Sequence, residues 1–344
     1  MFRSSTVMAA LLLSIPLFAL LNLAMGSVYI PFGDVVNILS GGDANSEVWY
    51  NIVLKTRLPQ TLTAMACGAG LSVAGLQMQT VFRNPLAGPS VLGISSAASL
   101  GVALVVLLSG ALGGGILTQF GVFGNTALTL AAMAGAMSVM ALIVYLSRKV
   151  ESSVTLLVVG VLIGYIASAI IGVLKYFSSE EDVHAYVIWG LGSFARVTGG
   201  QVYVFTGLMA VLLPLTMLLI KPLDILLLGE QYARNLGLNL NRTRTLVITS
   251  AGALVAIVTA YCGPIMFLGL AVPHICRALF ATSSHRILMP ATLLCGASLA
   301  LLCNLIARLP GFEGALPINS VTALIGAPVA LTVLLKRKHK RKEL

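Results

Sequence analysis

The sequence predicts an all-α polytopic membrane protein with about ten transmembrane helices, and three features of the chain support this. Of its 344 residues, 58% are hydrophobic and only 9% are charged, whereas about 25% are charged in a typical soluble domain. Ten apolar runs approach the length of roughly 20 helical residues needed to cross a hydrocarbon core about 30 Å thick. The basic residues between these runs favour one side of the membrane.

The predicted spans are bounded by charges and by Pro or Gly, and they run near 7–26, 58–80, 91–110, 124–147, 153–174, 202–220, 246–262, 265–280, 288–306 and 318–335. The first also resembles a signal peptide, because Arg3 precedes an apolar run that ends in small residues. Its near-spanning length and the membrane segments after it favour a span. No stretch has room for a soluble domain, so residues 1–344 are predicted to form a single transmembrane domain.

Two stretches, 66–93 and 251–273, share a helix rich in small residues that leads into a turn broken by Pro and Gly. In the predicted topology the first helix runs inward and the second runs outward. That relation is typical of the inverted repeats of transporters. The sequence therefore indicates an inverted internal repeat.

The distribution of Lys and Arg predicts the orientation. With the N-terminus inside, sixteen of the 21 basic residues fall in cytoplasmic loops or in the basic tail 336–344. The other five lie outside or near the outer face, and they are Lys55, Arg57, Lys175, Arg196 and Arg308. This asymmetry follows the positive-inside rule and predicts that both termini are cytoplasmic.

The chain carries no pattern typical of an active site. No lysine follows a glycine, which excludes a GxxxxGK[ST] nucleotide-binding loop. The four histidines and five cysteines lack the spacing of metal ligands, so no metal or other cofactor is expected on this chain. The net charge of +10 comes from scattered loops and the C-terminus, which does not predict a nucleic-acid-binding face.

The most informative connection is the inner segment 221–245, KPLDILLLGEQYARNLGLNLNRTRT. Leucines followed by Gly229-Glu230, and then Ala233, Leu236 and Gly237, predict a short amphipathic helix, a glycine turn and a second short element. An exposed apolar surface with a charge on the cytoplasmic face indicates a protein partner. An interfacial helix that lies on lipid is the alternative.

Four blocks of sequence together resemble the FecCD-type permeases, the membrane subunits of ABC importers for ferric siderophores, haem and cobalamin. They are RLPQTLTAMACGAGLSVAGLQMQTVFRNPLAGPSVLG at 57–93, LGEQYARNLGL at 228–238, GPIMFLGLAVPHICR at 263–277 and LPINSVTALIGAPVALTVLL at 316–335. The resemblance covers most of the chain, with the blocks in the same order. It implies a type II ABC importer permease in the bacterial inner membrane.

The resemblance also implies roles for individual residues. The coupling segment of that family contacts a cytoplasmic ATPase, and here it would use Gly229, Glu230, Ala233, Leu236 and Gly237. Outer arginines of the family receive acidic residues of a substrate-binding protein, and Arg57 and Arg308 match such positions. Anchoring to lipid headgroups is the alternative for both. Some relatives have another arginine where this chain has Gln60, which would change the docking site.

The inner gate of the family lies at the turn into the fifth span, which here is Ser152-Ser153. Helix capping is the alternative role for these two serines. The sequences Arg83-Asn84-Pro85 and Pro273-His274 are typical of turns at the inner ends of helices.

The implied assembly contains a second copy of this chain, two ABC ATPase subunits that hold ATP and Mg, and a periplasmic or lipid-anchored substrate-binding protein. The expected cargo is a ferric siderophore, haem or a related metal chelate, which crosses by alternating access, and cobalamin is the alternative cargo. A secondary carrier is disfavoured because the spans nearly lack ionisable residues. A membrane-embedded enzyme is disfavoured because no acid or histidine cluster is visible.

Overall fold

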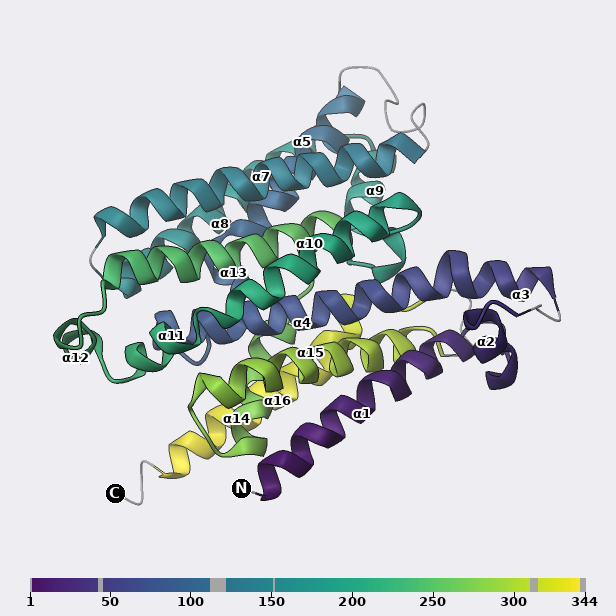
Figure 1. Ribbon diagram of the computed structural model, residues 1–344. Coiled ribbons are helices and arrows are strands. Elements are labelled where there is room, and N and C mark those ends of the chain that lie inside the picture. Colours follow the sequence, from purple (N-terminus) through teal and green to yellow (C-terminus); the bar gives the residue numbers. More distant parts are fainter. Residues whose placement is uncertain (1, 43–45, 112–121, 151, 310–314, 341–344) are drawn as a thin grey trace. The chain divides into compact units, whose positions relative to one another are not determined.

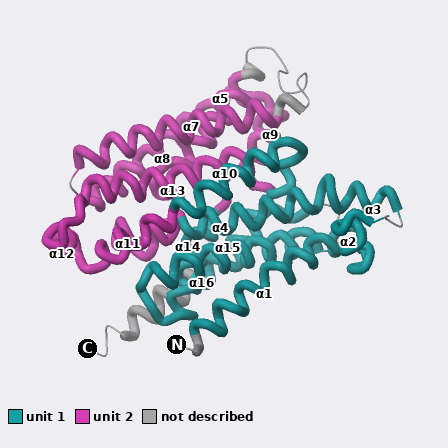
Figure 2. The backbone as a smooth tube through the Cα atoms, in the orientation of Figure 1, with its two compact units in different colours: residues 1–73, 194–215, 266–344 teal, residues 74–193, 216–265 magenta. Residues whose placement is uncertain are grey.

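The computed structural model describes residues 2–42, 46–111, 122–150, 152–309 and 315–340, and within these ranges the regular structure is helical. Contacts divide the chain into two compact units (Figure 2). Unit 1 comprises 1–73, 194–215 and 266–344, and unit 2 comprises 74–193 and 216–265. The units interleave along the sequence. The prediction of a single transmembrane domain stays a prediction.

Ten helices correspond one to one with the predicted spans (Figure 1). They are α1 (Phe2–Ala24), α4 (Leu58–Val81), α5 (Ile94–Ala111), α7 (Val122–Lys149), α8 (Ser153–Tyr176), α10 (Gly200–Met217), α13 (Leu240–Cys262), α14 (Leu268–Phe280), α15 (His285–Ala307) and α16 (Ile318–Lys340). Among the described residues, seven helical segments are long and apolar enough to cross a membrane, and α5, α14 and α16 contain shorter apolar stretches. The prediction of an all-α polytopic protein is confirmed.

The seventh span begins earlier than expected, because α13 starts at Leu240 and carries Asn239 as its N-cap, whose side chain accepts a hydrogen bond from the Arg242 amide. A capping Asn satisfies an amide that the first helical turn leaves unpaired. The polar first turn therefore belongs to the helix, although apolar content alone placed it in the loop.

Short helices fill the long connections. The connection after α1 contains α2 (Phe32–Leu39), α3 (Glu47–Asn51) and a π-helical turn, η1 (Ile52–Arg57), while α9 (Glu180–Gly190) follows α8. Two 3-10 turns, η2 (Pro89–Leu92) and η3 (Phe194–Arg196), precede α5 and α10. The helices α11 (Ile220–Leu227) and α12 (Glu230–Asn235) lie between α10 and α13 in the sequence.

Small residues let helices approach closely within each unit. In unit 1, a methyl group on Gly68 of α4 would overlap the backbone of α15 at Gly296. In unit 2, the same holds between Gly101 of α5 and the backbone of α7 at Ala131. Close backbone approach at small residues is the usual basis of helix packing in membranes. The high glycine content has this role here.

A buried polar network joins three helices of unit 1. Asn22 of α1 donates to the Leu301 carbonyl at 2.9 Å and accepts from Asn304 of α15 at 2.7 Å. Gln60 of α4 donates to the same Asn304 at 3.0 Å. Gln60 is buried and held in this network, and its effect on the predicted docking site stays a prediction.

Basic residues lie near both ends of each unit. In unit 1, α1 begins and α16 ends at one end (Figure 1), while Arg57 and Arg308 meet at the other end of α1, beside Gly26. In unit 2, Arg83 and Arg244 lie near α11 and α12. Lys175 lies against the Tyr186 ring of α9, with the ammonium nitrogen 4.6 Å from the ring centroid.

The two stretches of the predicted repeat share a backbone feature. In 66–93, Arg83 has φ 46° after α4, and in 251–273, Phe267 has φ 68° before α14. Positive φ is rare for residues with side chains. The inverted relation between the stretches stays a prediction.

The five cysteines are buried. His274 and His285 are buried in α14 and α15. Pro273 and His274 lie inside α14, so the turn predicted at these two residues is wrong.

Candidate functional site

The inner segment forms what we call the ledge, residues 220–238, made of α11, α12 and the turn after each. Gly229 separates the two helices with φ 114°, and Gly237 ends the second with φ 80°. Side chains reach these backbone conformations only with strain, whereas glycine adopts them freely. The predicted order of helix, glycine turn and second short element is confirmed.

The ledge buries one face and exposes another. Leu223 and Ala233 are fully buried in unit 2. Four large apolar side chains are exposed instead, namely Leu227, Leu228, Tyr232 and Leu236, the last three by 60%, 69% and 61%. So much apolar surface on so short a segment is typical of a contact site. Ala233 supports the ledge from within, and Leu236 belongs to the exposed face.

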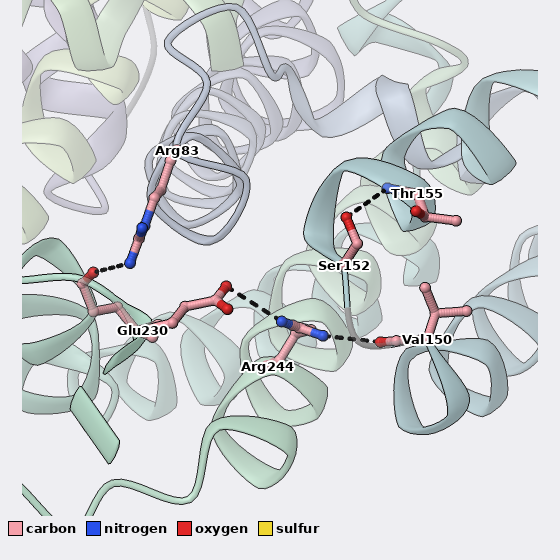
Figure 3. Close-up of polar contacts among 7 residues, drawn as sticks. Arg83, Val150, Ser152, Thr155, Glu230 and Arg244 are labelled. Atoms are coloured by element: carbon pink, nitrogen blue, oxygen red, sulfur yellow. Dashed lines mark hydrogen bonds and ion pairs between the residues drawn. The ribbon is translucent and has the colours of Figure 1, made fainter. Parts of the chain in front are cut away.

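One ion pair holds the start of α12. Glu230 Oε1 lies 3.4 Å from Arg244 Nη2, and the Arg244 side chain is only 7% exposed while that of Glu230 is 41% exposed. Arg244 Nη1 also donates to the Val150 carbonyl at 3.0 Å. Figure 3 shows Arg244 between Glu230 and the turn that leads into α8. Within this chain, Glu230 is therefore bonded to Arg244, and its contact with an ATPase stays a prediction.

Arg83, which lies in the loop after α4, contacts the end of α11. Its Nη2 atom donates to the Leu226 carbonyl at 3.4 Å (Figure 3), where a helix C-terminus leaves carbonyls unpaired. The loop is shaped by Asn84, whose side chain accepts from the Leu86 amide at 2.9 Å. The expectation that Arg83-Asn84-Pro85 forms a turn is confirmed, and Arg83 adds a direct contact with the ledge.

Ser152 and Ser153, the predicted gate, start α8. Ser152 is the N-cap, and its side chain accepts from the Thr155 amide at 3.4 Å. The capping alternative is therefore confirmed for Ser152. Ser153 Oγ is buried without a hydrogen-bond partner, and small polar groups of this kind are available to line a pathway. The gating role stays a prediction.

Arg57 is a buried cation in unit 1, with only 1% of its surface exposed. Nη1 donates to the carbonyls of Leu23 at 2.7 Å and Ala24 at 2.9 Å, and Nη2 donates to Val28. Arginine suits this task because its planar guanidinium has five donors in a fixed geometry. Arg57 therefore fastens the end of α1 to the start of α4.

Arg308 lies beside Arg57 at this end of unit 1. A methyl group on Gly26 would lie 3.0 Å from Arg57 Nη2 and 3.2 Å from Arg308 Nη2. Arg308 Nη1 and Arg57 Nε are both buried without a hydrogen-bond partner. Burial lowers the pKa of Arg308, yet guanidinium groups stay protonated in proteins. In the described part of the chain no acid pairs with either arginine.

The structure thus gathers the predicted site residues into two places. The ledge residues and Ser152-Ser153 lie at one end of unit 2, and Arg57 and Arg308 meet at one end of unit 1. Sequence reasoning missed Arg244 and Tyr232. A basic residue in the first turn of a span resembles ordinary loop charge, so nothing in the sequence distinguished Arg244 from Arg242. No His, Cys, Asp or Glu group suited to a metal ion occurs among the described residues.

Comparisons with known proteins place the chain among permeases. The sequence model of the FecCD transport family matches residues 12–336. The vitamin B12 import system permease protein BtuC of Shigella boydii serotype 18 is 36% identical over 325 residues, covering 93% of this chain and 92% of that protein. The protein of the same name from Escherichia coli O17:K52:H18 is 38% identical over 298 residues, covering 87% and 88%.

Two solved structures are similar in fold. A metal-chelate type ABC transporter in an inward-facing conformation gives a TM-score of 0.82 at 29% identity, covering 96% of this chain and 99% of that one. PsaBC from Streptococcus pneumoniae gives a TM-score of 0.54 at 17% identity, covering 88% and 95%, a likeness of fold alone.

Proposed function

This chain belongs to the FecCD transport family, and on that premise we propose that it is the membrane permease subunit of an ATP-driven importer that moves a metal chelate inward. The observation that carries the proposal is the ledge. It presents exposed apolar side chains between two glycine turns and is fastened to the helices of unit 2 by Arg83 and Arg244. Such a surface binds a partner and passes its movement to the helices.

The partner of the ledge is an ABC ATPase that holds ATP and Mg. Burial of apolar surface is worth about 25 cal/mol per Å² removed from water, so Leu228, Tyr232 and Leu236 supply affinity. Gly229 and Gly237 fix the outline of the ledge, and Ala233 packs beneath it. Glu230 keeps α12 attached to this chain. The chain performs no hydrolysis of its own.

The outer partner is a substrate-binding protein with acidic residues, which docks at the paired charges of Arg57 and Arg308. Arg308 faces that partner, while Arg57 holds the site together from beneath. A second copy of the chain completes the pathway, with Ser152-Ser153 at its inner gate. The even number of spans and the bias of basic residues support cytoplasmic positions for both termini. Cysteines introduced at 45 and 190, and not at 340, should react with a reagent added from outside.

The cargo is a metal chelate, and the comparisons favour cobalamin, because relatives at 36–38% identity are vitamin B12 permeases. Ferric siderophores and haem, the cargo expected first from the sequence, agree with the similarity to a metal-chelate type transporter. Uptake of labelled cyanocobalamin, haem and a ferric siderophore by proteoliposomes containing the complete importer identifies which one is carried.

The coupling role is tested with Glu230→Lys and Gly237→Val. The first places two cations against each other at Arg244, and the second forces a branched side chain into positive φ, which costs on the order of 1–3 kcal/mol. Both should reduce copurified ATPase or separate hydrolysis from uptake. Gly207→Val is the matched control, because Gly207 lies on α10 with open space around it and no positive φ.

An interfacial helix gives the opposite result for Glu230→Lys, since a basic residue strengthens binding to anionic lipid. Wild-type levels of both copurified ATPase and ATP-dependent uptake in the two variants would exclude the coupling role of the ledge.

A further inference from the structure

Arg244 contacts two elements to which the proposed function gives different roles. One is the ledge, which it reaches through Glu230 at 3.4 Å, and the other is the turn into α8, which it reaches through the Val150 carbonyl at 3.0 Å. The two contacts use different nitrogens of one guanidinium. Val150 lies two residues before Ser152, the N-cap of α8. A single side chain therefore lies between the ATPase-binding surface and the predicted gate.

The environment of Arg244 makes this bridge stiff. The side chain is 7% exposed and starts from the first turn of α13, a helix that is buried along most of its length. The adjacent Thr245 hydroxyl lies 3.4 Å from that of Ser147 near the end of α7, and Ser147 is fully buried. Two neighbouring residues of α13 thus hold the end of α7 and the turn after it.

The chemistry of arginine matters at this position. A guanidinium is planar and directs its donors in fixed directions, so two partners bound to different nitrogens keep a fixed separation. Lysine carries the same charge on one freely rotating nitrogen, and it can satisfy Glu230 without holding the Val150 carbonyl in register. The substitution Arg244→Lys thus keeps the positive charge and removes the bridge between Glu230 and the Val150 carbonyl.

We propose that Arg244 is a positioning residue that transmits displacement of the ledge to the first turn of α8, and so couples ATPase movement to the inner gate. The proposal rests on the proposed function, since it needs an ATPase that moves the ledge. When the ATPase moves α12, Glu230 displaces the Arg244 guanidinium. The Val150 carbonyl then follows, because it is bonded to the same rigid group. Transmission of this kind needs a coupling measurement, because position between two sites does not establish it.

The experiment compares Arg244→Lys with wild type and with Arg242→Lys, in the complete importer reconstituted with its ATPase and binding protein. Arg242 is the matched control, because it lies two residues away on the same helical turn and its side chain is exposed. Movement of α8 is read from Val154→Cys, an exposed position in its first turn, as the rate of labelling by a water-soluble maleimide with and without ATP. The native cysteines are buried and give little background.

In wild type and Arg242→Lys, ATP should change the labelling rate at position 154. In Arg244→Lys, copurified ATPase and hydrolysis should stay within about twofold of wild type, while cargo moved per ATP falls about tenfold, in the range of coupling changes from linking residues. The ATP-dependent change in labelling should be lost. Glu230→Gln should have no further effect on labelling when added to Arg244→Lys.

Unchanged cargo per ATP and unchanged labelling in Arg244→Lys would overturn the proposal. So would loss of copurified ATPase in that variant, because Arg244 would then support the ledge and not connect it to α8. Failure of the proposed function is distinguishable, since it appears in wild type as absence of copurified ATPase and of ATP-dependent uptake.

Discussion

The two arginine sites of this protein handle buried positive charge in opposite ways. At the ledge, Arg244 pairs with Glu230 and a carbonyl, so its charge is balanced within the chain, and the exposed face includes the apolar side chains of Leu228, Tyr232 and Leu236. At one end of unit 1, Arg57 bonds to carbonyls, and Arg308 lies beside it. In the proposed function, the first site adheres to its partner by burial of apolar surface, and the second attracts an acidic partner.

Because of this difference, the two surfaces are expected to bind their partners by different forces. Association through apolar area is nearly independent of ionic strength, whereas attraction between charges is screened over roughly 10 Å at 0.1 M salt. Salt should therefore loosen the binding protein and spare the ATPase. The following predictions test this contrast from the largest expected effect to the smallest.

The largest effect is expected from Arg57→Met, which removes the hydrogen bonds to the Leu23, Ala24 and Val28 carbonyls and leaves only that of Ala24 with another donor, the Ile30 amide. Loss of hydrogen bonds from a charged group and the remaining unpaired carbonyls should lower the free energy of unfolding by about 3 kcal/mol. Thermal unfolding of the purified chain in detergent measures this loss of stability. Arg57→Lys keeps the charge and part of the bonding, so its unfolding midpoint should lie between those of wild type and Arg57→Met. An unchanged midpoint in Arg57→Met would show that the outer site is not a structural clamp.

A smaller effect is expected at the exposed face of the ledge. Tyr232→Ala combined with Leu236→Ala removes two large apolar groups and should weaken binding of the ATPase by about 2 kcal/mol, or roughly thirtyfold, as for anchor residues of interfaces. The weakening should be the same at low and high salt. Tyr203→Ala is the control, because Tyr203 is also an exposed tyrosine but lies on α10. A strong salt dependence of the wild-type affinity would contradict the apolar character of the ledge.

The smallest effect is expected from Arg308→Gln, which removes one charge from the outer pair while keeping a polar side chain. The association rate of the binding protein should fall about tenfold at low salt and become less sensitive to ionic strength. Copurified ATPase should not change. An association rate equal to wild type at every salt concentration would return Arg308 to the role of a lipid anchor.

Much of the fold followed from the sequence, because apolar length and charge bias depend on local composition. The glycine turns of the ledge were also predictable, since Gly229 and Gly237 interrupt short apolar stretches. The contacts of Arg244 were not, because its partners lie 14 and 94 residues away along the chain. Arg57 was expected at the surface, where basic residues that begin a span usually lie. Its burial depends on the irregular path after α1, which brings the Val28 carbonyl to the guanidinium.

The bond between Asn22 and Asn304 constrains the order in which the protein is built. Synthesis releases α1 first, and the oxygen of its Asn22 side chain finds Asn304 only after 282 further residues have been made. Until then the Asn22 amide can bond within its own helix, to the Phe18 carbonyl at 2.8 Å, while its oxygen must be sheltered by the insertion machinery or by water near the outer headgroups. Polar groups left unpaired in lipid cost several kcal/mol. The bond between Asn22 and Asn304 therefore forms only after α15 has been made.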